Sequence, residues 1–247
     1  MIDSCHSGAV GSVSELLPMV AIPPGRFLMG GMEDDKFVSE VELPSRMAVV
    51  ENGFQMSETP ITRDQWLEVM GSLPAGNIGS LPGNAPVVCV SFPDAQSFCR
   101  EISGSCRLPS EVEWEYACRG GSGTVFPHGS NVSTDDANYL YDELGFQVGK
   151  GKLMPVGSYG RNGFGLSDMI GNVCEWVADA WHSGYKGAPF GTAPWTAGGK
   201  HGCRVIRGGG WDHLPRVLRA SWRDWAPENA RWDNLGFRVV TEHGEVI

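Results

Sequence analysis

Seven cysteines offer the widest range of chemistry in this sequence, because thiolates act as nucleophiles and bind soft metal ions. They stand at positions 5, 89, 99, 106, 118, 174 and 203. No two of them have the CxxC spacing, which argues against a zinc knuckle and against a thioredoxin-like redox site. Free cysteines are typical of a reducing compartment, so we expect a cytoplasmic protein.

Two carboxylates in a glycine-rich segment have the chemistry of a hard-cation site. Asp168 and Glu175 are separated by a stretch that includes Gly171 and Val173, whose backbone carbonyls are free to bind. Carboxylate and carbonyl oxygens are the ligands that Ca²⁺ prefers. The sequence therefore predicts a structural calcium site made of these four residues. The alternative is an irregular loop whose acidic side chains cap nearby amides.

The segment 211–234 is dense in tryptophan and arginine. These two side chains often dominate binding surfaces through their area, stacking and bidentate hydrogen bonds. The alternative is a scaffold role, which we expect for Arg219 and Arg223 on a strand over 216–223, facing the same side. The sequence predicts that an unknown protein or small-molecule ligand binds here. The predicted ligand-binding residues are Trp211, Asp212, His213, Leu214, Arg216, Val217, Ser221, Trp222, Asp224, Trp225, Arg231 and Trp232.

The composition predicts a loop-rich fold pinned by aromatic side chains. The 247 residues include 34 Gly, 16 Pro, 9 Trp and 10 Phe. Glycine and proline favour turns, whereas Trp and Phe bury large areas. The net charge of −10 argues against nucleic acid or an anionic membrane as a partner. No apolar run approaches the roughly 18 residues of a membrane-spanning helix, and no secretory signal is visible.

Three helix starts carry capping signals, at Thr62, Ser91 and Ser110. In each, a hydroxyl residue is followed three positions later by a side chain that can satisfy its backbone amide. Gly120 is expected to end the third helix. Short strands are expected over 19–31, 46–57 and three runs near the C-terminus, while 120–200 shows little periodicity. We predict an α+β domain over 19–247, preceded by a linker at 1–18.

Several motifs in order give the chain its resemblance to the formylglycine-generating enzyme (sulfatase-modifying factor) family. They are MVAIPPGRFLMGG from 19, ETPITRDQWLEVM from 58, RLPSEVEWEYACRGG from 107, NGFGLSDMIGNVCEWVADAW from 162, RVIRGGGW from 204 and NLGFRVV from 234. The resemblance implies a C-type-lectin-like fold with little regular secondary structure, short antiparallel strands and two to three helices. It also implies calcium at the positions matching Asp168, Gly171, Val173 and Glu175, and it places 162–181 in a central loop.

The resemblance does not extend to the family's oxidase chemistry. Its oxidases bind copper(I) with two cysteines near the C-terminus, but residues 204–247 contain none. We therefore expect no copper and no catalysis. The family's sulfoxide synthases need iron-binding histidines, whereas the six histidines here lack HxxxH spacing. Cys174 and Cys203 leave open an unorthodox oxidase that forms formylglycine on sulfatase-type cysteines.

Two further resemblances concern partners. The run DSCHSG at 3–8 resembles the nucleophile motif of metacaspases. The histidine base that such a protease needs is absent upstream, so we interpret the run as an inert remnant of a longer caspase-like fusion. In retroelement-diversified variable proteins of this fold, the C-terminal segment carries the ligand-binding residues. A non-catalytic recognition module is therefore the predicted function.

Overall fold

The structure is a computed structural model that describes residues 16–76, 81–103 and 105–242. The metacaspase-like run at 3–8 lies outside the described residues. Leu17, in the segment predicted to be a linker, is 1% exposed and packs into an apolar cluster of the domain. No helix among the described residues is long and apolar enough to cross a membrane.

The three predicted helices form where their capping signals stand. They are α2 (Arg63–Met70), α3 (Phe92–Ile102) and α4 (Glu111–Arg119). Thr62, Ser91 and Ser110 each make a capping box, which satisfies amides that the first helical turn leaves unpaired. Gly120 ends α4 with a φ of 56°, in the left-handed region that glycine adopts without a steric penalty.

The strands are short and lie in three sheets. One sheet has the order β1-β4-β9, one pairs β2 with β3, and one has the order β7-β6-β5-β8. All pairs are antiparallel except β5 with β8, which is parallel. The bounds are β1 (Met19–Ile22), β2 (Gly25–Met29), β3 (Arg46–Val50), β4 (Phe54–Ser57), β5 (Cys174–Ala180), β6 (Cys203–Arg207), β7 (Arg223–Pro227), β8 (Leu235–Phe237) and β9 (Val240–Glu242).

Two sequence-based expectations about strands were wrong. The 162–181 segment was expected to be a loop, but its second half forms β5, which lies between β6 and β8 in its sheet. The run 216–223 was expected to be one strand. Instead, a 3₁₀ turn over Pro215–Val217 is followed by further turns, and β7 begins only at Arg223. The reason is the inward-facing ion-pair network described below.

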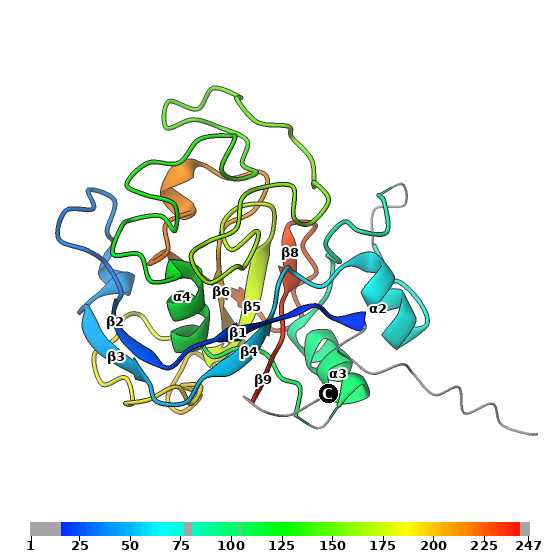
Figure 1. Cartoon of the computed structure of the whole chain (residues 1–247), viewed down its shortest axis with the longest axis horizontal. Helices are drawn as coiled ribbons and strands as arrows, with labels where there is room; N and C mark the ends of the chain where they lie inside the picture. The colour runs from blue at the N-terminus through cyan, green and yellow to red at the C-terminus, as the bar shows by residue number, and fades with distance from the viewer. Residues whose placement is uncertain (1–15, 77–80, 104, 243–247) are drawn as a thin grey trace, which may run out of the picture.

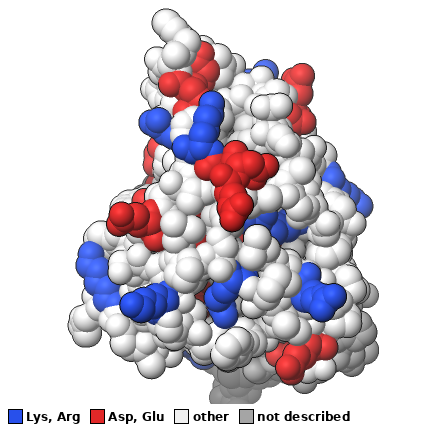
Figure 2. Space-filling view, turned by 90° about the vertical axis from the view of Figure 1, so that its left-hand side faces the viewer, with Lys and Arg blue, Asp and Glu red and all other residues white. Residues whose placement is uncertain are grey.

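The helices lie on different sides of the four-stranded sheet (Figure 1). Helices α2 and α3 pack against each other, and α4 contacts both β2 and β5. One apolar cluster includes Trp66, Phe98 and Trp176, and a second is built around Trp114 and Phe54. The long connections of 120–170 lie at one end of the molecule (Figure 1). On the face shown in Figure 2, lysine and arginine side chains are spread singly and form no continuous basic patch.

Candidate functional site

Helix α4 presents two buried carboxylates to arginines from the four-stranded sheet. Glu111 accepts hydrogen bonds from Arg223 on β7 at 2.6 and 2.8 Å, and it also contacts Arg207 at 3.3 Å. Glu115 accepts from Arg207 on β6 at 2.6 Å and from Arg119 at 2.8 Å. All of these side chains are buried, and buried charges are tolerated only when they are paired. The network therefore fixes β6 and β7 against α4.

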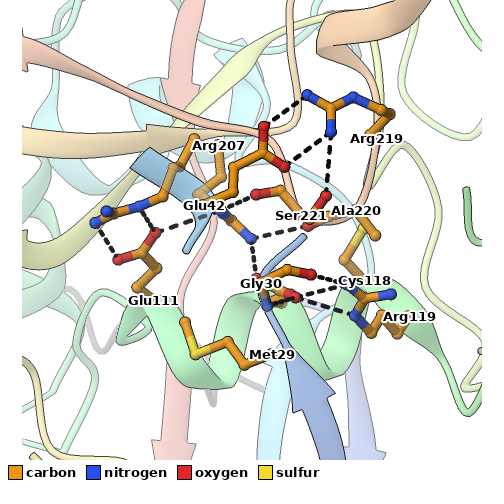
Figure 3. A network of polar contacts seen from close by, with 12 residues as sticks. Met29, Gly30, Glu42, Glu111, Cys118, Arg119, Arg207, Arg219, Ala220 and Ser221 are labelled. Carbon is orange, nitrogen blue, oxygen red and sulfur yellow. Dashed lines mark hydrogen bonds and ion pairs between the residues drawn. The ribbon is translucent and has the colours of Figure 1, made fainter. Parts of the chain in front are cut away.

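A second ion-pair cluster holds the segment just before β7 against the interior of the domain. Arg219 donates to Asp35 at 2.6 Å and to both carboxylate oxygens of Glu42 at 2.7 and 2.8 Å. The carbonyls of Ala220 and Ser221 accept from Arg207 at 2.8 and 3.0 Å (Figure 3). These carbonyls face the interior, so they cannot pair with a neighbouring strand. This explains why the run 216–223 is not one strand.

Asp179 holds the N-terminus of α4 and is a buried titratable group. Its carboxylate accepts from the backbone N–H of Glu111 at 2.7 Å and from that of Trp195 at 2.8 Å. Burial, together with the negative charge of Glu111, raises the pKa of Asp179 to about 7. The group therefore binds a proton more tightly in the folded state than in the unfolded chain.

This pKa predicts a pH-dependent stability. A raised carboxyl pKa gives stability that is fully present below the unfolded value of 3.8 and is lost as the pH rises through about 7. Relative to Asp179→Asn, the wild type should lose on the order of 2 kcal/mol between about pH 5 and about pH 8. Urea unfolding at both pH values measures this. Asp34→Asn, at an exposed position, is the control and should show no such difference.

The twelve predicted ligand-binding residues differ in exposure. Ser221 is buried and belongs to the ion-pair network, so it does not face a ligand. Trp211, Asp212, His213, Leu214, Val217, Trp222 and Trp225 are half-buried, whereas Arg216, Asp224, Arg231 and Trp232 are exposed. The predicted set therefore includes a buried residue of the protein framework as well as residues on the surface.

Four of these residues are held close to one another by local contacts. The Trp211 indole N–H donates to the carbonyl of Asp233 at 3.3 Å, and Asp212 accepts from Asn234 at 2.9 Å. Nδ1 of His213 accepts the Gly210 N–H at 2.9 Å, and its ring meets that of Trp222 edge-on with centroids 6.1 Å apart. Burial lowers the pKa of His213, which favours the neutral ring that this hydrogen bond requires.

Other members of the set contact different parts of the chain. Trp225 lies under the ammonium of Lys200, 3.2 Å from the ring centroid. Arg231 pairs with Asp94 on α3 at 2.5 Å. Arg216 and Glu143 form a partly exposed pair at 3.7 Å. The segment therefore presents one compact group, 211–213 with Trp222, and several separate surface residues.

The predicted calcium loop contains one carboxylate that is paired and one that is not. Glu175 accepts from the Trp114 indole N–H at 2.7 Å and from Arg238 at 2.8 and 2.9 Å. Among the described residues, Asp168 accepts the Gly157 N–H at 2.6 Å, and its Oδ1 is buried without a partner. Burial raises the pKa of Asp168 to about 6.

These observations test whether the four residues fit a cation. A carboxylate offers about four lone-pair positions, so Glu175 keeps one on Oε1 after its three hydrogen bonds. The unpartnered Oδ1 of Asp168 is a free hard ligand, and the negative charge of Glu175 acts on it. The Gly171 carbonyl is not free as expected, because it accepts the Val173 N–H at 2.8 Å. The two carboxylates therefore carry the fit to a Ca²⁺ ion, which would supply positive charge beside Asp168. The calcium site remains a prediction.

The six described cysteines are all buried and unbridged. Burial raises the pKa of the Cys118 thiol to about 12 and that of Cys174 well above its usual value. Cys174 begins β5 and Cys203 begins β6, and these strands are antiparallel, so the two thiols stand at opposite ends of the pair. The described residues contain no group of three or more His, Cys, Asp or Glu side chains suited to a metal ion.

A family profile described as the sulfatase-modifying factor enzyme 1-like domain matches residues 10–243. The chain belongs to this family. The match covers every strand and helix described above, and the expected family is confirmed.

The curated relatives include an enzyme and an inactive paralogue. Mouse formylglycine-generating enzyme is 32% identical over 199 residues, covering 72% of this chain and 51% of that protein. Mouse inactive C-alpha-formylglycine-generating enzyme 2 is 34% identical over 173 residues, covering 64% of this chain and 50% of that protein. The chain thus spans about half the length of these relatives, and family membership is compatible with presence or absence of catalysis.

Solved structures confirm the fold. PvdO from Pseudomonas aeruginosa superposes with a TM-score of 0.79 at 32% identity, covering 91% of this chain and 94% of that one. Treponema denticola variable protein 1 gives a TM-score of 0.75 at 24% identity, with the same coverage. The domain therefore has the α+β, C-type-lectin-like fold of the formylglycine-generating enzyme family.

Proposed function

We propose that this domain is a non-catalytic recognition module that binds a protein or small-molecule ligand through segment 211–234. The supporting observation is that residues 204–247 contain no cysteine, in the stretch where the oxidases resembled by this chain bind copper(I). Soft thiolates suit copper(I), and the carboxylates and histidine present here are harder ligands. The described cysteines lie elsewhere and are buried.

The geometry of the segment suits recognition. The segment offers aromatic rings at Trp211, His213 and Trp222, and a carboxylate at Asp212. The ion pairs of Arg219 with Glu42 and of Arg223 with Glu111 hold the segment against the rest of the domain. A surface that is already ordered loses less conformational entropy when a ligand binds. The ion pairs beneath the segment thus preorganise a binding surface.

An oxygen-consumption assay tests the absence of catalysis. The purified full chain, supplied with copper(I), a reductant and a peptide containing a sulfatase-type CxPxR cysteine, should consume no oxygen above the background and form no formylglycine. Mass spectrometry of the peptide measures the product. A fully active relative assayed in parallel shows that the conditions support turnover.

The competing candidate is an active oxidase, which the 32% identity to mouse formylglycine-generating enzyme favours. Its thiolates would have to come from outside 204–247. Copper-dependent turnover by the wild type would establish this second function and overturn the proposal. Loss of that turnover in Cys174→Ala or Cys203→Ala would assign it to these thiols, and its persistence would assign it to another cysteine.

The proposal extends to two properties of the parent protein. Segment 211–234 is proposed to vary between sibling loci, as in retroelement-diversified variable proteins, and sequencing such loci should show substitutions clustered there. The run at 3–8 is proposed to join a caspase-like effector to this sensor domain. If sibling sequences show no such clustering, the proposal that segment 211–234 varies between loci is wrong.

Surface residues of the segment should be removable without unfolding the domain. Trp232 is 43% exposed and Trp225 is half-buried, so Trp225→Ala with Trp232→Ala should lower the free energy of unfolding by about 1 kcal/mol or less. His213→Ala should cost more, about 1–2 kcal/mol, because it leaves the Gly210 N–H without its acceptor. Thermal and urea unfolding measure both. A larger loss in the double variant than in His213→Ala would place the two tryptophans in the framework.

A further inference from the structure

Cys99 and Cys106 form a pair that the proposed function does not use. Cys99 lies in the last turns of α3, and its carbonyl accepts the Ser103 N–H at 3.3 Å. The Ser103 carbonyl in turn accepts the Cys106 N–H at 3.2 Å. These two hydrogen bonds link Cys106 through Ser103 to the end of the helix that holds Cys99.

The two thiols line the same cavity and belong to the same apolar cluster. Interaction with Cys106, together with burial, keeps the pKa of the Cys99 thiol well above its usual value. Two interacting thiols lose their protons in two steps that belong to the pair.

A cavity gives small molecules access to this pair. It has a volume of about 370 Å³, and its lining includes both cysteines together with Arg100, Arg107 and Arg204. Arg107 and Arg204 are ion-paired, with Glu113 and Glu228 among their partners. The charge of Arg100 acts to lower the pKa of Cys99, but the interaction with Cys106 and burial raise this pKa by more. A thiolate in an accessible, electropositive setting is the reactive form of cysteine.

The remaining buried cysteines lack this combination. Cys118 is 0% exposed and Cys174 is 1% exposed. Their thiols hold their protons, since burial raises the pKa of each. Cys89 and Cys203 are 4% and 7% exposed, and none of these four cysteines shows a thiol partner among the contacts of the described residues. A second thiol at the same cavity therefore distinguishes Cys99 and Cys106 from the other described cysteines.

We propose that Cys99 and Cys106 form a dithiol–disulfide site that is oxidised by hydroperoxides. One of the two sulfurs, as a thiolate, attacks one peroxide oxygen, which breaks the O–O bond and gives a sulfenic acid and hydroxide. The other sulfur then attacks the sulfenic sulfur, which forms the S–S bond and releases the sulfenic oxygen as water once the second thiol proton is transferred. Overall, two thiols lose two electrons and two protons, and hydrogen peroxide is reduced to two waters.

The disulfide would connect two parts of the fold. It would join the end of α3 to the segment beside Arg107, which forms a β-bridge with Val240 of β9. The oxidised state would therefore fix the helix end to the edge of the β1-β4-β9 sheet. This site lies in a different part of the chain from segment 211–234, so it does not depend on the proposed function.

Peptide mapping of the wild-type full chain tests the site directly. Reduced protein, freed of reductant, is treated with hydrogen peroxide, denatured, alkylated and digested with trypsin. Cleavage after Arg100 and Arg107 separates peptide 64–100, which contains Cys99, from peptide 101–107, which contains Cys106. The expected result is a disulfide between these peptides, a loss of two of the seven thiols, and full recovery with dithiothreitol.

Variants and a probe complete the test. Peptide 64–100 also contains Cys89, so the mapping is repeated in Cys89→Ala, where the link should remain. Cys99→Ala should abolish the link, whereas Cys203→Ala, a matched buried control, should retain it. Phenylarsine oxide, which bridges two neighbouring thiols, should block the reaction in wild type. Peroxide treatment that leaves the peptides unlinked, oxidises Cys106 without linking it, or still links Cys106 in Cys99→Ala overturns the proposal.

Discussion

Replacing Arg223 by alanine should lower the free energy of unfolding by about 3–5 kcal/mol, since removing one partner of a buried ion pair leaves an uncompensated charge. Arg223 is 2% exposed and makes two hydrogen bonds to Glu111. It also donates to the carbonyls of Val41 and His182, at 3.0 and 2.9 Å, so the substitution removes four hydrogen bonds at once. Urea unfolding monitored by tryptophan fluorescence measures the loss.

The matched control is another arginine of the same segment. Arg216 pairs with Glu143 at 3.7 Å, with 48% and 32% of the side chains exposed. Solvent screens such a pair, so Arg216→Ala should change the stability by about 1 kcal/mol or less. If Arg223→Ala costs no more than this control, the ion pairs on α4 are not what holds the segment in place.

The parts of the fold that follow from local sequence were predicted correctly. Each helix start depends on a hydroxyl side chain and a partner three residues later, and Thr62, Ser91 and Ser110 carry that signal within a single turn. The inward turn at Arg219 has no local signal. Its partner Glu42 is 177 residues away, and a single sequence contains nothing that pairs the two.

The candidate site was predicted in part for the same reason. Counting tryptophans and arginines found segment 211–234 but treated Ser221 and Trp232 alike, although one is buried and the other exposed. The buried acids were missed. Glu111 and Glu115 are four positions apart and therefore share a face of α4, and this spacing of two acids was the available signal.

Chelation with EDTA should lower the melting temperature of the wild type and leave that of Asp168→Asn unchanged. A ligand that binds only the folded state stabilises it, and its removal reverses the effect. Without a cation, the Asp168 carboxylate is 5% exposed with Oδ1 unpartnered, which is unfavourable. Asparagine carries no charge at this position, so the variant neither needs the ion nor responds to its loss. Thermal unfolding with added Ca²⁺ and with EDTA measures both proteins.

Glu175→Gln separates calcium binding from ion pairing. The glutamine leaves Arg238, which is 0% exposed, without its anionic partner, so the variant should lose about 3–5 kcal/mol with and without Ca²⁺. A loss in this variant alone therefore says nothing about a metal. The decisive comparison is the EDTA response, which should be present in wild type and absent in Asp168→Asn. If EDTA does not change the wild-type melting temperature and elemental analysis finds no bound metal, Asp168 is a strained buried acid and the calcium site does not exist, while the Glu175–Arg238 pair still stabilises the fold.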